Sequence, residues 1–188
     1  MTVSSFLRFS GLCLIFTGIL FVLFAIMYSI SSLRTLASYV NLIGMLFLLL
    51  GIAGMYVRQM QDMGKFGFIA FLIYFWGAGM WTGFGWSEAF VIPVLKENAP
   101  HLFSGSIPNQ INIGLMISLF SFFIGMLVFN LLTAVKAILP RWAALILVIV
   151  PIIDFIPIGN YLAQPLAGIA FIWLGSSLWN GKYEEGLK

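Results

Sequence analysis

Long apolar runs, separated by short polar or turn-forming segments, fill most of this chain. A bilayer core of about 30 Å is crossed by about 20 apolar residues in a helix, so each run is long enough for one transmembrane helix. Unpaired backbone groups are costly in hydrocarbon, and a helix pairs its own. The runs predict six transmembrane helices, at 9–28, 36–57, 66–86, 112–135, 142–158 and 161–179.

Turn-forming residues mark the breaks between the predicted helices. Gly64 separates the second helix from the third, and Pro140 precedes the fifth, where its φ suits the start of a helix. Gly159 belongs to a very short turn before the sixth helix, which predicts that the fifth and sixth helices lie antiparallel side by side. The longest loop, 87–111, is expected to carry a short helix at the membrane interface, stopped by Pro100.

Composition places the whole chain in one membrane domain. Of 188 residues, 62% are hydrophobic and 8% are charged, which is too little polar surface to cover a soluble globule. The predicted fold class is therefore an all-α, polytopic six-transmembrane-helix bundle that forms a single domain over 1–188. The apolar run after Arg8 is too long for a signal peptide and lacks a convincing cleavage site, so we expect an uncleaved first helix.

Basic residues fall unevenly on the two sides of the predicted topology. Because Lys and Arg favour cytoplasmic loops, the imbalance predicts that the N- and C-termini both lie on the cytoplasmic side of the membrane. The basic residues are scattered rather than gathered on one face, so nucleic acid is not an expected partner. The side that holds the termini carries Arg8, Arg58, Lys65, Lys136, Arg141, Lys182 and Lys188, and the other side carries Arg34 and Lys96.

Asp154 lies between two prolines in the segment VIVPIIDFIPIGN, which spans 148–160. At about 1.5 Å per residue it is roughly 18 Å from the start of the predicted fifth helix, past the bilayer middle. An aspartate at a helix centre costs about 2.5 to 3.5 kcal/mol, so it needs a partner, water or a proton. Pro151 and Pro157 each remove a backbone donor, and broken backbone at this depth is tolerated against protein or a water-filled cavity.

Asp154, Asn160 and Gln164 are therefore expected to cluster near the external mouth of the hairpin formed by the last two helices. Two roles for Asp154 stay open. It is either a structural acid that pins the hairpin to a neighbour, or a proton or cation site in an outward-facing cavity. Glu88 lies about 33 Å along the third helix, at the outer interface, where a rim charge is expected rather than a direct partner of Asp154.

The third helix contains Gly79 and Gly83 in a small-xxx-small spacing, which lets helix backbones approach closely. Packing within the chain is the favoured interpretation, and a face for a second copy or another membrane protein is the alternative. Asn41 and Asn130 are expected to add hydrogen bonds between helices.

The sequence offers little support for catalysis. It lacks the nucleophile-elbow, zinc-protease, phosphate-loop and dinucleotide motifs. The single histidine, His101, excludes a haem with two histidine ligands, and the single cysteine, Cys13, excludes an internal disulfide. A zinc site made by Glu88, Glu97 and His101 has no recognised ligand spacing. We therefore expect no metal site and no cofactor, and the sequence leaves catalysis open but without support.

Three segments resemble those of small bacterial integral membrane proteins: GMYVRQ at 54–59, SEAFVIPVL followed by NAP within 87–100, and LPRWA at 139–143. The resemblance spans most of the chain through loop and helix-end signatures. It implies a bacterial six-helix membrane protein, and it assigns no activity and no functional residue.

Two functions are consistent with these patterns. The leading hypothesis is transport or binding of a small molecule or ion through an outward-facing cavity between the third, fifth and sixth helices. Asp154 would be the switchable acid, Asn160 and Gln164 the polar lining, and Glu88 a charge at the rim. The rival is a non-catalytic accessory, immunity or sensor subunit that docks on a membrane partner through the glycine-rich third helix. A wet cavity reaching Asp154 favours the first, whereas a packed Asp154 and an exposed small-residue groove favour the second.

Overall fold

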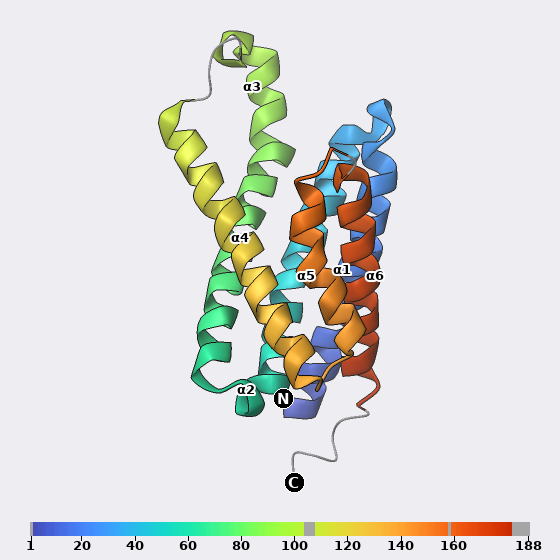
Figure 1. Ribbon diagram of the computed structural model, residues 1–188. Helices are drawn as coiled ribbons and strands as arrows, with labels where there is room; N and C mark the ends of the chain where they lie inside the picture. Colours follow the sequence, from blue (N-terminus) through green and yellow to red (C-terminus); the bar gives the residue numbers. More distant parts are fainter. Residues whose placement is uncertain (1, 104–107, 158, 182–188) are drawn as a thin grey trace.

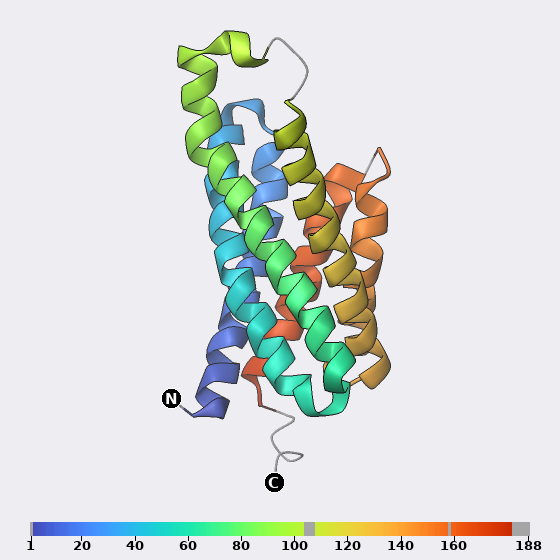
Figure 2. The same cartoon turned by 90° about the vertical axis from the view of Figure 1, so that its left-hand side faces the viewer.

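The structure is a computed structural model that describes residues 2–103, 108–157 and 159–181, without the side chain at position 160. The described chain consists of helices joined by short turns and contains no strand, which confirms the all-helical class. Its main helices form an elongated bundle (Figures 1 and 2). They are α1 (Val3–Tyr28), α2 (Arg34–Trp86), α3 (Ile92–Asn98), α4 (Asn109–Lys136), α5 (Arg141–Asp154) and α6 (Gly159–Trp179), with short helical turns at Ser31–Leu33, Ser87–Val91 and Pro100–Phe103.

The long helix α2 reverses its direction at Gly64. The φ of 58° and ψ of −151° at this residue are non-helical and lie in a region that is open almost only to glycine. The two halves of α2, 34–63 and 65–86, therefore fold back on each other, and the rings of Tyr56 and Phe71 stack with centroids 4.4 Å apart. The predicted break at Gly64 is confirmed.

Several helices have the length and surface of membrane-spanning segments. Four helical stretches are long and apolar enough to cross a bilayer: α1, the run Ser31–Asn98, α4, and Tyr161–Trp179 of α6. Large apolar side chains lie on the surface, where Phe66 is 81% and Trp76 is 70% exposed, and such a surface suits lipid. With 14 residues, about 21 Å, α5 is shorter than a bilayer core. Six transmembrane helices and cytoplasmic termini stay predictions.

The helices form a ring that closes on itself. α1 packs on α2, α2 on α4, α4 on α5, α5 on α6, and α6 returns to α1. As predicted, α5 and α6 lie antiparallel and side by side (Figure 1). Buried side chains from every helix of the ring fill its interior, including Leu14, Met45, Phe129, Leu147 and Phe171. The centre of the ring is therefore the place where residues far apart in the sequence meet.

Glycines bring the backbones of α1 and α6 into contact. A Cβ added at Gly11 would lie 2.7 Å from the carbonyl oxygen of Gly175, and one added at Gly168 would lie 2.6 Å from that of Gly18. Lipid supplies no hydrophobic drive between helices, so close packing of this kind is a main source of their association. These two pairs close the ring between its first and last helices.

Gly79 and Gly83 do not make the contact within the chain that their spacing predicted. No described atom lies within 4 Å of a Cβ added at either position. The glycine of this helix that packs closely is Gly77, where an added Cβ would meet the backbone of Phe122 on α4. Successive helical residues are about 100° apart, so positions 77 and 79 face nearly opposite directions and the predicted pair points away from α4.

The predicted fifth helix is too long at its C-terminal end. α5 ends at Asp154 rather than at 158. Pro157 lacks the N–H that would continue the helix, and its ring disfavours helical backbone in the residue before it. The acid is therefore at the end of a short helix rather than inside a long one.

The predicted loop after the third helix begins as a helix. α2 continues through a π-helical turn, Ser87–Val91, directly into α3. This wider turn accommodates Pro93, which cannot donate to the carbonyl of Ala89. Pro100 follows the end of α3, as predicted, since Ala99 before it has left the helical region.

Hydrogen bonds between helices come from residues other than the predicted asparagines. Gln59 donates to Thr133 Oγ1 at 3.3 Å and joins α2 to α4, while Thr17 donates to the Gly44 carbonyl at 3.2 Å and joins α1 to α2. The Asn130 amide donates within its own helix. The polar contribution to packing is therefore made mainly by side chains that also bond to a backbone carbonyl.

Replacing Gly168 with leucine is expected to destabilise the bundle, because the new side chain meets the backbone of α1. Overpacking typically lowers the free energy of unfolding by about 1 to 3 kcal/mol. The backbone of α1 cannot move aside as a side chain could, so we expect a loss at the upper end of this range or above it. Gly79→Leu is the matched control on an open face. Thermal unfolding in detergent compares the two, and equal stability of both variants would contradict the α1–α6 contact.

Candidate functional site

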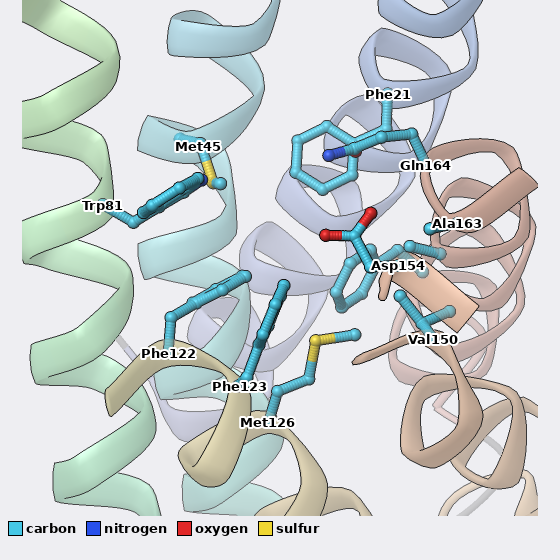
Figure 3. A pocket seen from close by; sticks show the side chains of 12 residues that line it. Phe21, Met45, Trp81, Phe122, Phe123, Met126, Val150, Asp154, Ala163 and Gln164 are labelled. Carbon is cyan, nitrogen blue, oxygen red and sulfur yellow. The ribbon is translucent and has the colours of Figure 1, made fainter. Parts of the chain in front are cut away.

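Asp154 directs its carboxylate into a small cavity inside the ring of helices (Figure 3). The cavity has a volume of about 50 Å³. That is room for a few water molecules or one ion, and it is far below the size of a pocket for an organic ligand. All the helices of the ring contribute to its wall, through Phe21 of α1, Met45 and Trp81 of α2, Phe122 of α4, Val150 of α5 and Phe171 of α6.

The wall of the cavity is almost wholly apolar. The rings of Phe21 and Phe171 meet edge to face at 6.0 Å, and those of Trp81 and Phe122 lie parallel at 6.4 Å. The Asp154 side chain is half-buried, and no residue in the described part of the chain gives its carboxylate a hydrogen bond or an ion pair. An ionised carboxylate is costly in such surroundings unless something pairs with it.

Gln164 extends into the same cavity from α6 (Figure 3). Its Oε1 atom is buried and accepts no hydrogen bond from the described residues. A carboxylate oxygen and an amide oxygen are both acceptors, so the pair lacks a partner that a proton, a cation or a bound water molecule would supply. The structure thus brings Asp154 and Gln164 together, as expected, whereas the side chain of Asn160 lies outside the described residues.

The turn between α5 and α6 fixes the end of α5 and hence the position of Asp154. A Cβ at Gly159 would collide with the Ile153 carbonyl, so the close return of the chain requires glycine. Pro151 inside α5 and Pro165 inside α6 each leave one helical carbonyl without its usual donor. The turn also lies below the level of α3 and of the α1–α2 turn, so the acid is within the length of the bundle (Figures 1 and 2).

Glu88 does not line this cavity, and its place at the rim stays a prediction. It lies exposed in the π-helical turn and faces a different pocket with Arg34 and Lys96. The helical run from α2 into α3 extends beyond the end of α5, which stops at Asp154 (Figure 1). Partial burial raises the pKa of the Glu88 carboxyl, and the Lys96 ammonium partly opposes this rise.

The aromatic wall of the cavity is the part of the site that sequence reasoning did not find. Phe21, Phe122 and Phe171 come from three apolar runs that contain many other phenylalanines, and nothing in their spacing distinguishes them. In the described ranges, no group of three or more His, Cys, Asp or Glu side chains is arranged to hold a metal ion.

Comparisons with protein-family models, with curated proteins and with solved structures find no match to this chain. The class of the protein therefore follows from its fold alone. It is an all-helical protein in which several apolar helices are long enough to cross a membrane.

Replacing Glu88 with glutamine is expected to change how stability depends on pH. Because the pKa of Glu88 is raised in the folded state, its contribution to stability is fully present below the pKa of the unfolded chain, near 4.3, and is lost as the pH rises through the folded value. The variant does not titrate there, so its stability relative to the wild type should increase toward neutral pH. Unfolding in detergent across this range measures the difference.

Glu97→Gln is the control for that experiment, since it removes an exposed carboxylate from the same helical run. Parallel pH profiles for the wild type and the Glu88 variant would contradict the raised pKa.

Proposed function

We propose that this protein is a multi-pass membrane protein that binds a proton or a small cation at Asp154 and passes it across the bilayer. The observation that carries the proposal is the pair of unsatisfied acceptors, the Asp154 carboxylate and Gln164 Oε1, in one small cavity inside the helix ring. An ionisable side chain within a membrane domain is costly, and such residues mark ion and proton pathways.

The size and chemistry of the cavity favour an ion over a small organic molecule. About 50 Å³ holds an ion with a water molecule, whereas organic ligands occupy roughly 300 Å³ or more. Carboxylate and amide oxygens are hard ligands, which suit protons and hard cations. The sequence suggested transport or binding of a small molecule or an ion. Of these, the size and chemistry of the cavity best support binding and transport of a proton or another ion.

The proposed topology has six passes with both termini in the cytoplasm of a bacterium. The passes would be α1, the two halves of α2, α4, α5 with the turn after it, and α6. The start of α1 and the end of α6 lie at the same end of the bundle, and most basic residues fall on that side in the predicted topology (Figure 1). The short α5 would then end inside the hydrocarbon and leave Asp154 facing the cavity.

Asp154→Asn is expected to reduce ion flux to background in liposomes that contain the purified protein, because the amide cannot take up a proton or a positive charge. Proton, Na⁺ and K⁺ gradients are the three probes. Asp62→Asn, the same change at an exposed position near the α2 reversal, is the control and should keep wild-type flux. Gln164→Leu should lower the flux by removing the second acceptor.

Thermal unfolding of each variant separates loss of function from loss of fold. A correctly folded Asp154→Asn protein that passes ions like the wild type would overturn the proposal, and so would a wild-type protein that passes none of the three ions.

A second candidate is the accessory subunit that docks on a membrane partner through the glycine-rich helix. It is favoured by the open surface at Gly79 and Gly83, where no atom of the described residues lies within 4 Å of an added Cβ. The Gly79→Leu variant distinguishes the two functions, since it would block docking on this face but leave flux through the Asp154 cavity unchanged.

A further inference from the structure

A second pocket lies at the end of the bundle that carries α3, far from the start of α1 (Figure 2). It forms between the beginning of α2 and the helical run that joins α2 to α3. Its volume is about 460 Å³, and it shares no lining residue with the Asp154 cavity. A pocket of this size is in the range that accommodates small organic ligands or headgroups.

Arg34 faces this pocket from the first residue of α2. Its Nε donates to the Tyr28 carbonyl at 3.4 Å, and its guanidinium carbon lies 5.5 Å from the centre of the Tyr28 ring. The terminal nitrogens make no hydrogen bond to any residue in the described part of the chain. A guanidinium that is held through Nε presents its remaining N–H groups as a fork, which matches two oxygens of a phosphate group.

Lys96 supplies a second positive charge from α3. Its Nζ lies 5.8 Å from the centre of the Phe103 ring. Glu88 lines the same pocket and is close enough to Lys96 for the ammonium to act on its pKa. The other lining side chains are neutral, so two cations and one carboxylate leave the pocket with a net charge of +1.

The rim of this pocket has the character of a membrane interface. Two exposed aromatic side chains, Tyr28 and Phe103, line it, and two more, Trp86 and Phe90, are exposed on the helical run that carries Glu88. Aromatic rings of this kind are enriched at the level of the lipid headgroups. The oxyanion that is abundant at this level is the phosphate of the lipids themselves, and the net positive charge of the pocket attracts it.

We propose that the pocket binds a phosphate group, with Arg34 as its bidentate partner and Lys96 as the second cation. The volume beyond the phosphate holds the group esterified to it. Thr35 adds a hydroxyl to the same wall, and Glu88 disfavours ligands with additional negative charge. A lipid headgroup and a soluble phosphate ester share this chemistry.

The test is native mass spectrometry of the full chain in detergent, with phosphatidylglycerol as one probe and inorganic phosphate as the other. Arg34→Gln and Lys96→Gln are each expected to weaken binding about tenfold or more, since each removes a charge-assisted contact. Glu88→Gln should tighten it. Lys136→Gln and Arg141→Gln remove exposed charges at the opposite end of the bundle and should leave binding unchanged.

Size-exclusion chromatography first checks that each variant is folded, because a folded variant elutes as the wild type does. The binding results then decide the proposal. Phosphatidylglycerol bound by the wild type and lost in the Arg34 and Lys96 variants supports a lipid site. Inorganic phosphate bound with the same dependence, in the absence of lipid binding, supports a soluble phosphate ester instead. The proposal is overturned if neither probe binds, or if the Arg34→Gln, Lys96→Gln double variant binds like the wild type.

Discussion

The contact between α1 and α6 determines most of what the rest of the molecule can do. Two glycine pairs, Gly11 with Gly175 and Gly18 with Gly168, let the first and last helices touch along their backbones. Association in lipid depends on close packing, and a larger residue at any of these positions would keep the two helices apart. Without this contact the ring would be open between α1, which carries Phe21, and α6, which carries Gln164.

A closed ring explains why an acid can be kept at this depth. Asp154 ends a short helix whose continuation is stopped by Pro157, and the chain returns at once through Gly159. The carboxylate is directed inward, toward aromatic rings and one amide, rather than outward toward lipid. Because the wall is apolar, an unpaired negative charge on Asp154 costs free energy. Binding of a proton or a cation would remove this cost. In the proposed function, the same packing that holds the helices together also forms the site that binds the ion.

The apolar runs predicted the helices, and Gly64 predicted the reversal of α2, because both are local properties of the chain. The end of α5 was also encoded locally, in Pro157, but the apolar residues around it suggested a longer helix.

The glycines that bring helix backbones together were not identified from the sequence. Gly79 and Gly83 have the better-known spacing, whereas the glycines of the pairs that close the ring are seven residues apart on α1 and on α6. Which helix a glycine meets depends on the tertiary arrangement. For the same reason Asp154 and Gln164 could be paired from their positions in one hairpin, but Glu88 could not be assigned to the pocket of Arg34 and Lys96.

Infrared spectroscopy of the purified protein tests the central claim most directly, because the C=O stretching band of a protonated carboxyl group reports on a single acid. The account predicts a carboxyl band that responds to pH or to added cation, that is absent in Asp154→Asn and that remains in Glu88→Gln. A spectrum in which no such band depends on Asp154, at any pH or cation concentration, would contradict it.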